Sequence, residues 1–481
     1  MGNKHRHHIN RRQFLGQASC AAIGATTFFS SILNLKAIGA SSILNSSVAS
    51  AGDYRAIVCL LNSGGMDSFN MLIPRDQEFY KTYASTRSNI AIPLQNITAL
   101  SGTTVDGRSF GLHPSFPNLT TLYNEGKLAF ISNVGTLVQP ISRQQFWDGN
   151  VPIPLGLYSH ADQVMQWQTG LPDKRDSIGW GGKISDLLMS ANENDVLSMN
   201  MTLSGTNIYQ TANNTTAYAI QPKLGAVTIQ DYNEDWVLNK MKKQAIDKML
   251  NKSYDNIFKH QYTSTIKQGV DGASIINAAI EAHPELDQFF TPYPDIDEGR
   301  NANLSDSFKM VAKVIADNET TKMSRQIFFI DYSGWDHHDD LLDLQMNQFS
   351  ELDNAVFEFQ RAMESLGMAD QVTVFSMSEF GRTLTSNGNG TDHAWGGNVF
   401  VSGGAVSGGK IYGTFPDLTL GLNNPLELGG GVLIPTTSVD TYFAEIALWF
   451  GVPKSELVTL FPKLGYFYDT SSTENPIGFL T

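Results

Sequence analysis

Cysteine is nearly absent from this sequence, which has only two, Cys20 and Cys59, among 481 residues. A chain with so few thiols cannot rely on a disulfide framework, so its stability has to come from the packing of an apolar core. Cys59 lies in an apolar run that is typical of a buried strand, and Cys20 lies in a segment that we expect to be removed. We therefore expect the mature chain to form no intrachain disulfide.

Long apolar runs are also missing. The longest weakly apolar stretch, Ala18–Ala40, is rich in alanine, glycine, serine and threonine and is interrupted by Asn34 and Lys36. A membrane-spanning helix needs about 20 predominantly apolar residues. This stretch is too polar for that, and no later run approaches the required length, so we expect no transmembrane segment in the mature chain.

The first 51 residues follow the order of a secretory signal. The basic and polar stretch Met1–Asn10 precedes the arginine pair Arg11 and Arg12, the weakly apolar run comes next, and the small residues of Val48–Ala51 suit a signal peptidase. The arginine pair indicates the twin-arginine version of this signal. The pattern predicts that the twin-arginine translocase is a partner during export and that the mature protein is periplasmic or extracellular.

Basic residues are the minority of the charged ones. The chain has 33 lysines and arginines against 47 aspartates and glutamates, and its formal net charge is −14. Removal of the predicted signal takes away five basic residues and no acidic one, which brings the net charge to −19. A surface this acidic repels phosphate backbones, so we expect no nucleic-acid partner.

Short apolar runs that are typical of buried strands alternate with helical stretches. The strand candidates are Ala56–Leu61, Leu128–Ile131, Ile327–Ile330 and Val372–Phe375. Between the last two, Leu341–Leu366 carries apolar residues three or four positions apart, as an amphipathic crossover helix does. This alternation predicts an α/β fold with a mainly parallel sheet. We expect one domain over residues 52–481, with residues 203–320 approximately forming an insertion or cap.

Acidic residues follow three of these strand candidates. Asp67 comes after the first strand, Asp331 and Asp336 after the third, and Glu379 after the fourth. The carboxyl ends of parallel strands share one edge of a sheet, where ligands bind, so these carboxylates should converge. Carboxylates that lie together repel one another unless they are protonated or bound to a cation.

Histidines accompany these carboxylates at His337, His338 and His393. A mixed set of oxygen and imidazole ligands suits zinc or manganese better than calcium, which takes oxygen ligands. The pattern therefore favours a divalent metal at the sheet edge. The alternative is that the acidic residues cap helices and that the histidines are satisfied core residues.

Six motifs appear in the order seen in the domain-of-unknown-function 1501 family. They are Leu61–Asn70, Gly111–Pro114, Ser159–Gln163, Gly334–His338, Ser378–Thr383 and Thr391–Gly397. The chain resembles this family over nearly all of its mature part. The family commonly begins with a twin-arginine signal and looks like a branch of the alkaline phosphatase and sulfatase superfamily. The resemblance implies a three-layer α/β/α sandwich, alkaline-phosphatase-like, and a metal-dependent ester hydrolase.

The resemblance also implies a set of metal ligands. They are Asp67, Asp336, His338, Glu379 and His393. Asp331 and His337 are the alternatives for the aspartate and histidine pair of one metal. The superfamily has an Asp-His pair where this chain has Glu379 followed by Phe380, and phenylalanine binds no metal. The second metal site is therefore incomplete, or it borrows a ligand such as His160 or His113.

Ser159 and Arg382 are the candidate catalytic residues. Ser159 stands near the place of the superfamily's nucleophile, but it could instead cap the helix that carries Asp162. Arg382 could hold an anionic substrate through two parallel hydrogen bonds, or pair with Glu379 or another carboxylate. Both alternatives remain open for both residues.

Two functions of different classes follow from these features. The first is an exported metal-dependent hydrolase of phosphate or sulfate esters, whose substrate is a small-molecule or glycan ester. The second is a non-catalytic secreted protein that uses the same fold to bind a carbohydrate or a cell-envelope partner. The presence of Glu379-Phe380 in place of an Asp-His pair favours the second. The metal-binding residue types at Asp67, Asp336, His338 and His393 favour the first.

Overall fold

The apolar runs predicted to be strands form the buried centre of one large sheet in the computed structural model of the chain. The structure describes residues 54–102, 107–194, 196–226, 229, 232, 236–292 and 303–481. The predicted signal peptide, residues 1–51, lies outside the described residues. Residues Ala51–Thr481 form one compact unit.

The large sheet contains ten strands. They are β1 (Arg55–Leu61), β5 (Leu128–Gly135), β6 (Asn200–Thr202), β7 (Tyr218–Gln221), β8 (Gly225–Ala226), β9 (Arg325–Asp331), β10 (Val372–Met377), β11 (Gly397–Gly403), β12 (Lys410–Tyr412) and β13 (Thr437–Ser438). Their order is β12-β5-β11-β10-β1-β9-β6-β7-β8, and β13 pairs with β5. The run from β10 through β1, β9 and β6 to β7 is parallel, whereas β11 is antiparallel to both of its neighbours.

A second, antiparallel sheet is small. Its strands lie in the order β2 (Leu72–Pro74), β4 (Phe110–Leu112) and β3 (Thr98–Ala99).

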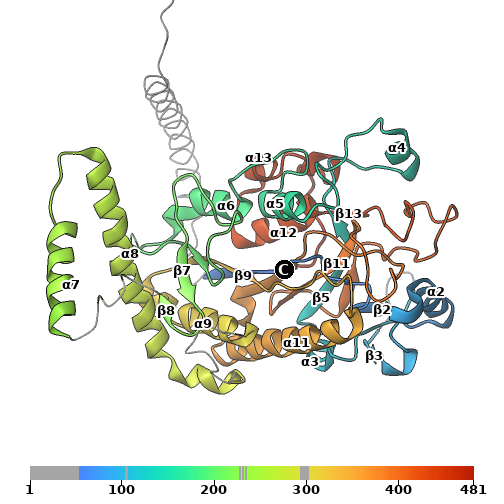
Figure 1. Cartoon of the computed structure of the whole chain (residues 1–481), viewed down its shortest axis with the longest axis horizontal. Coiled ribbons are helices and arrows are strands. Elements are labelled where there is room, and N and C mark those ends of the chain that lie inside the picture. The colour runs from blue at the N-terminus through green and yellow to red at the C-terminus, as the bar shows by residue number, and fades with distance from the viewer. Residues whose placement is uncertain are drawn as a thin grey trace, which may run out of the picture. The chain divides into compact units, whose positions relative to one another are not determined.

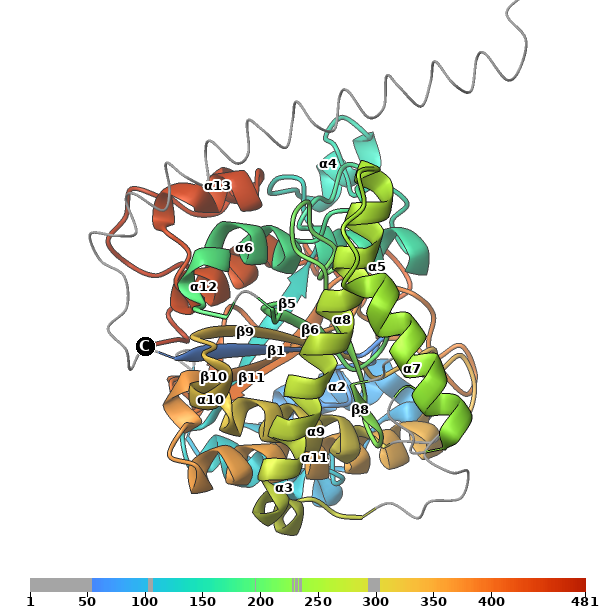
Figure 2. The same ribbon diagram turned by 90° about the vertical axis from the view of Figure 1, so that its left-hand side faces the viewer.

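Helices cover both faces of the large sheet. They are α2 (Gln77–Arg87), α3 (Pro117–Asn124), α4 (Arg143–Asp148), α5 (His160–Thr169), α6 (Trp180–Leu188), α7 (Val237–Leu250), α8 (Ile257–Ala282), α9 (Leu304–Ala316), α10 (Asn318–Thr321), α11 (Leu341–Ser365), α12 (Val439–Phe450) and α13 (Leu457–Leu460). Helices α3, α9 and α11 lie on one face, and α5, α6, α12 and α13 lie on the other (Figures 1 and 2). The predicted α/β sandwich with a mainly parallel sheet is confirmed.

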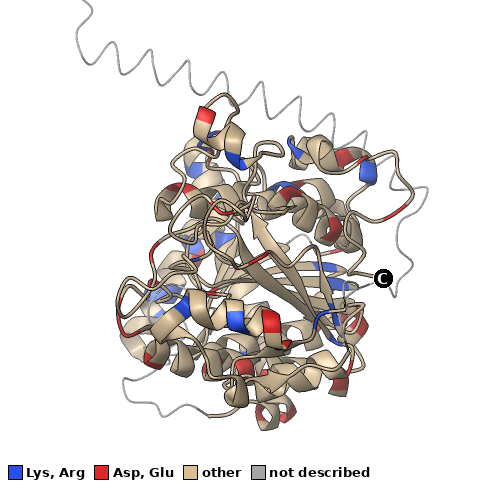
Figure 3. Ribbon diagram, turned by 90° about the vertical axis from the view of Figure 1, so that its right-hand side faces the viewer, with Lys and Arg blue, Asp and Glu red and all other residues tan. Residues whose placement is uncertain are grey.

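Burial on both faces explains why the central strands read as unbroken apolar runs. In β1, every residue from Ala56 to Leu61 is buried, and Cys59 among them is a free thiol. Parallel strands covered by helices on both sides need apolar side chains at successive positions. In α11, one stripe that includes Phe349, Val356 and Phe359 is buried against this layer. Charged residues lie mainly on the helices and loops around the sheet (Figure 3).

The region approximated as an insertion, residues 203–320, combines two kinds of helix. Helix α9 belongs to the core, because its residues from Leu304 to Phe308 and most of those that follow are buried. Helix α7 has no buried residue. In the part of the chain that the structure describes, no helix has both the length and the apolar character needed to cross a membrane.

A buried carboxyl group at the start of α12 makes stability depend on pH. Burial raises the pKa of Asp440 from 3.8 to about 7, although Ser438 donates a hydrogen bond to it. Because the folded pKa is raised, the folded state holds this proton more tightly than the unfolded state does. The stabilisation is complete below about pH 4 and is lost as the pH rises to about 7.

We expect Asp440→Asn to remove the loss of stability that the wild type shows as the pH rises. One unit of pKa corresponds to about 1.4 kcal/mol, so the free energy of unfolding of the wild type should fall by up to roughly 4 kcal/mol relative to the variant between pH 4 and pH 8. Chemical denaturation at several pH values measures the difference. Asp255→Asn, at an exposed position, should run parallel to the wild type. If the Asp440→Asn and wild-type curves were parallel as well, Asp440 would not carry the buried proton.

Candidate functional site

Two imidazoles and a carboxylate converge beyond the carboxyl ends of β9 and β10. His160 is the first residue of α5, Asp336 lies in the loop after β9, and His393 lies in the loop before β11. His160 Nε2 is 3.1 Å from His393 Nε2 and 3.5 Å from Asp336 Oδ2. His393 Nε2 is 3.4 Å from Asp336 Oδ1. Segments that are far apart in the sequence thus bring three metal-binding side chains within 4.8 Å of one another.

The other ring nitrogen of each histidine has an acceptor of its own. Glu379 Oε1 lies 2.7 Å from His160 Nδ1, and the Tyr158 carbonyl oxygen lies 2.8 Å from His393 Nδ1. Tyr158 holds its carbonyl there with a φ of 72°, a left-handed conformation that is costly for a residue with a side chain. These acceptors favour the neutral tautomer with a hydrogen on Nδ1, in which the lone pair of each Nε2 is directed into the cluster.

The geometry of this cluster fits a divalent metal. Two Nε2 lone pairs that face each other across 3.1 Å repel unless a cation or a shared proton lies between them. Ligands of tetrahedral zinc at bond lengths of about 2.0–2.1 Å lie roughly 3.3–3.4 Å apart, close to the separations found here. A carboxylate or backbone carbonyl on the outer nitrogen is the usual support for a metal-binding histidine.

His338 adds a fourth donor at the open side of the cluster. Its Nε2 lies 3.0 Å from His393 Nε2 and 3.0 Å from Asp336 Oδ1. Its Nδ1 lies 3.3 Å from Asp392 Oδ1, and 44 % of its side chain is exposed. Since 46 % of the Asp336 side chain is exposed as well, the cluster is open to solvent and to a ligand on this side.

Arg382 makes contacts with each of the loops that carry Gly65, Asp336 and Thr391. It is fully buried and donates to the backbone carbonyl oxygens of Gly65 at 2.7 Å and Thr391 at 3.1 Å. It also contacts the Asp336 carboxylate. Partial burial alone would raise the pKa of Asp336, but Arg382 and the neighbouring histidines lower it overall. Arg382 therefore has the structural pairing with a carboxylate, and that carboxylate is Asp336.

Glycine permits the close approach of two of these loops. Gly64 has a φ of 120°, and a Cβ there would lie 2.6–2.9 Å from the backbone of Trp335 and Asp336. The Gly64 amide donates to Glu379 Oε1 at 2.8 Å, so the same residue also holds the carboxylate that supports His160.

Phe380 forms an apolar wall for the imidazoles. Its ring centroid lies 4.8 Å from that of His160 and 4.6 Å from that of His393. Phe380 thus packs against the two histidines of this cluster. His160, named from the sequence only as a possible substitute ligand, is one of the three convergent groups.

Asp67 lies outside the cluster. Its side chain is buried and forms an ion pair with Arg87, the last residue of α2. Glu379 is also not among the three convergent groups, and it reaches them through His160. Asp336, His338 and His393 are the predicted ligands that the structure brings together.

The remaining candidates have contacts of other kinds. Ser159 caps α5, where its hydroxyl accepts a hydrogen bond from the Asp162 amide at 3.4 Å. His113 is buried between aromatic rings, and burial lowers its pKa to about 4. His337 is buried, whereas Asp331 accepts a hydrogen bond from Ser63 at 2.5 Å on the exposed edge.

The family model described as "Protein of unknown function (DUF1501)" matches residues 199–443, which is half of the chain. No curated protein matches the chain significantly. Among solved structures, a sulfatase from Pseudoalteromonas sp. is 12 % identical with a TM-score of 0.34, and the match covers 88 % of this chain and 72 % of that one.

Two further solved structures have similar values. The lipoteichoic acid synthase from Listeria monocytogenes is 10 % identical with a TM-score of 0.30, over 87 % of this chain and 78 % of that one. A phosphonate monoester hydrolase from Silicibacter pomeroyi is 10 % identical with a TM-score of 0.31, over 83 % of this chain and 74 % of that one. TM-scores of this size carry no conclusion about activity.

Proposed function

The chain belongs to the DUF1501 family, and we propose that it is a metal-dependent hydrolase of phosphate or sulfate esters. The family description names no activity, so the proposal is argued from the residues of this chain. The observation that carries the proposal is the convergence of His160 Nε2, His393 Nε2 and Asp336 on one point. Three protein ligands are the usual number in a catalytic zinc site, because they leave a position open for water or substrate.

Each residue of the cluster has a definite part in this proposal. His160, His393 and Asp336 hold the cation, and Glu379 and the Tyr158 carbonyl fix the orientation of the two imidazoles. A bound divalent cation supplies a Lewis acid and makes water easier to deprotonate near neutral pH. We assign zinc or manganese to the site, because its donors are mainly imidazole nitrogens.

Electrostatics make the binding of an anionic substrate depend on the metal. Asp336, Glu379 and Asp392 carry three negative charges at and beside the cluster, and Arg382 carries one positive charge, so the protein alone makes the site negative. A divalent cation offsets this excess of negative charge. The loaded site would therefore no longer repel a phosphate or sulfate ester, which would approach on the open side near His338.

We also propose that the protein acts outside the cytoplasm. The twin-arginine pattern of residues 1–51 supports export in the folded state, and folding before export would allow the metal to be bound first. The substrate class that fits this location is a small-molecule or glycan ester.

Turnover of chromogenic esters tests this function. Protein stripped of metal with a chelator and reloaded with zinc or manganese should hydrolyse 4-nitrophenyl phosphate or 4-nitrophenyl sulfate. Loss of a residue that only supports a metal ligand lowers activity by roughly 10–100-fold. His160→Ala removes a ligand itself, so its activity should fall by more than that. His260→Ala, at an exposed position on α8, should keep full activity. If the loaded wild type released no more nitrophenol than His160→Ala did, the hydrolase proposal would be overturned.

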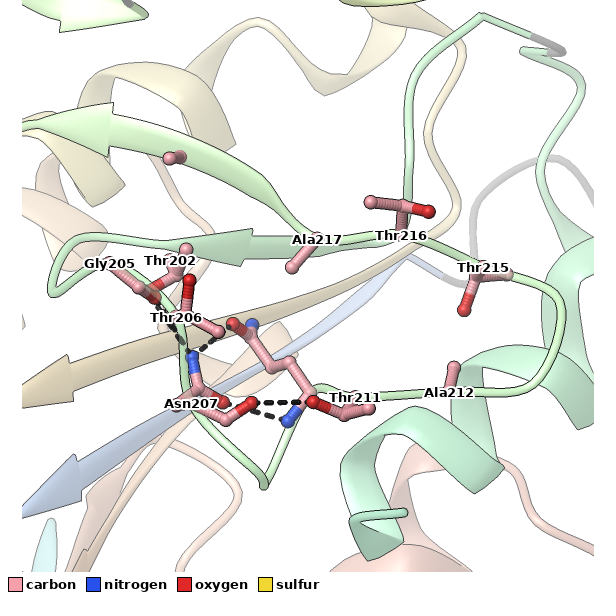
Figure 4. Close-up of a pocket in the computed structure, with 11 residues that line it drawn as sticks. Thr202, Gly205, Thr206, Asn207, Thr211, Ala212, Thr215, Thr216 and Ala217 are labelled. Carbon is pink, nitrogen blue, oxygen red and sulfur yellow. Dashed lines mark hydrogen bonds between the residues drawn. The ribbon is translucent and has the colours of Figure 1, made fainter. Parts of the chain in front are cut away.

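A second candidate function is the binding of a neutral, hydroxyl-rich molecule such as a carbohydrate. One observation favours it, namely a pocket of about 310 Å³ beside β6 and β7 (Figure 4). It is lined by threonine, asparagine, glutamine, glycine and alanine, without a charged side chain. Many of its polar groups already bond to one another, as Asn207 does to Thr202 and Gln210. Binding of a neutral sugar to chelator-treated protein, without turnover by the loaded protein, would favour this candidate.

A further inference from the structure

The helices α7 and α8 form a hairpin that is anchored at one end. The anchor is the carboxyl-terminal half of α8, where Val270, Ala273 and Ile276 are buried. There, the Asn277 side chain accepts from the Ala226 amide of β8 at 2.8 Å and donates to the Ala226 carbonyl at 3.0 Å. Helix α7 lies at the outer edge of the unit, on the far side of α8 from the sheet (Figure 1). The hairpin therefore presents α7 to its surroundings.

An apolar stripe runs along the exposed side of α7. Leu238, Met241, Ala245 and Met249 are spaced three or four residues apart, which places them on one face of a helix. Leu238 is 78 % exposed, Met241 63 % and Met249 54 %. Trp236, at the start of the helix, is 76 % exposed. A helix in a soluble domain normally turns such a stripe toward the core, whereas here it faces outward.

The first turns of α8 continue this apolar character. Ile257, Phe258 and Tyr262 are each more than two-thirds exposed. Residues 236–262 hold eight of the twenty large apolar side chains that the described residues expose. Single exposed apolar residues are normal, but a concentration of them marks an interaction surface.

Lysines border the stripe on both sides. At 100° per residue, Lys242 lies at one margin of the stripe and Lys248 at the other. The hairpin Val237–Ala282 contains seven lysines and four acidic residues, although acidic residues outnumber basic ones in the whole chain by 47 to 33. The hairpin is thus locally basic in an acidic protein.

This combination of side chains fits a lipid surface better than a protein partner. Lysine is depleted in protein–protein interfaces relative to the rest of the surface, and α7 carries four lysines. A helix with leucine and tryptophan on one face and lysines beside it is typical of segments that lie in the headgroup layer of a bilayer. Each lysine near an anionic surface adds about 1 kcal/mol of attraction.

We propose that α7 and the first turns of α8 bind the headgroup layer of an anionic lipid bilayer. The apolar stripe and Trp236 enter the boundary between headgroups and acyl chains, and the lysines at its margins face the lipid phosphates. The protein is then held at a membrane surface by a peripheral helix rather than by a spanning one. This inference is independent of the proposed hydrolase activity.

Vesicle sedimentation tests the proposal. The chain from Gly52 onward is used, because it belongs to the compact unit and lacks the basic leader, which could bind lipid by itself. It should sediment with vesicles of phosphatidylcholine and phosphatidylglycerol, and more weakly with phosphatidylcholine alone. The double variant Leu238→Glu, Met241→Glu should bind at least about 100-fold more weakly, because it removes two inserted apolar side chains and also adds two negative charges.

A matched control separates insertion from charge. Gln244→Glu combined with Gln268→Glu adds the same two charges at exposed polar positions of the same helices but removes no inserted side chain. Two charges at about 1 kcal/mol each correspond to a loss of at most roughly 30-fold, so this control should keep clearly more binding than the double variant. The fluorescence of the wild type should shift to the blue on vesicle addition, and Trp236→Phe should reduce that shift.

Three outcomes would overturn the proposal. The wild type could stay in the supernatant with anionic vesicles. The glutamine control could lose as much binding as the double variant. Size-exclusion chromatography could show that Leu238→Glu, Met241→Glu dissociates an oligomer while lipid binding is unchanged, in which case the stripe is an interface between copies of the chain.

Discussion

Replacement of His393 by alanine is expected to abolish the stabilisation of this protein by zinc or manganese. In the wild type, a metal at 100 times its dissociation constant should add roughly 2.7 kcal/mol to the free energy of unfolding. For a unit of this size, that corresponds to a rise in Tm of about 3 °C. Thermal unfolding of chelator-treated protein, with each ion then added back, measures the rise.

The central position of His393 is the reason for this large effect. Its Nε2 lies 3.1 Å from His160 Nε2, 3.0 Å from His338 Nε2 and 3.4 Å from Asp336 Oδ1. Removal of His393 takes away one of the three convergent ligands and leaves His160 and His338 linked through Asp336, which lies 3.5 Å from His160 Nε2 and 3.0 Å from His338 Nε2. Glu379→Gln should weaken metal binding by about 10–100-fold rather than abolish it, since Glu379 acts through His160 Nδ1.

The control for this prediction is His260→Ala, which removes an exposed histidine of α8 and should leave the metal response intact. An equal response of His393→Ala and the wild type would show that the ion binds elsewhere. Absence of any response in the wild type, with all ions tested, would remove the basis of the hydrolase proposal and leave the carbohydrate-binding candidate.

Replacement of Arg87 by alanine is expected to destabilise the fold more than any change at the surface. Arg87 and Asp67 are both buried and form an ion pair. Arg87 Nη1 also donates to the Thr383 carbonyl oxygen at 3.1 Å, next to Arg382. Removal of one member leaves the other charge uncompensated in the interior, which costs about 3–5 kcal/mol. Chemical denaturation of the two proteins measures the difference.

Arg175→Ala is the matched control. Arg175 also pairs with an aspartate, Asp162, at 2.7 Å, but 63 % of its side chain is exposed. An exposed pair contributes less than about 1 kcal/mol, so this variant should be nearly as stable as the wild type. Equal losses of stability in Arg87→Ala and Arg175→Ala would contradict the expectation that burial makes the ion pair of Arg87 the more important one.

The same ion pair gives a direct test of the expectation that Asp67 is a metal ligand. In the structure its carboxylate is engaged by Arg87, away from the cluster. Asp67→Asn should therefore lower the stability of the fold but keep the increment in Tm on metal addition. Loss of that increment would restore Asp67 to the ligand set.

Local sequence patterns were sufficient for the central elements of the fold. The runs at Ala56–Leu61 and Val372–Phe375 are uninterrupted and apolar because helices cover both faces of the sheet, and they correspond to β1 and β10. Helix α11 ends within one residue of the predicted boundary, because the three-to-four spacing of its buried residues is a local property.

The exposed stripe of α7 shows where such patterns are ambiguous. Its spacing of Leu238, Met241 and Met249 is the same as that of a helix packed on a core. Only the tertiary structure shows that Leu238, Met241 and Met249 are more than half exposed, since burial depends on where the other described parts of the chain lie.

For the candidate site, the sequence by itself determined that acidic residues follow the central strands and that His338 and His393 lie in nearby loops, because strand direction fixes which edge these residues share. Only the tertiary structure decided which of them meet. Asp67 forms an ion pair with Arg87, Glu379 contacts His160, and His160 reaches the cluster from the start of α5. These choices depend on loop packing across more than 200 residues of sequence, as between His160 and Glu379, and on individual side-chain rotamers. Neither is encoded in the spacing of residue types.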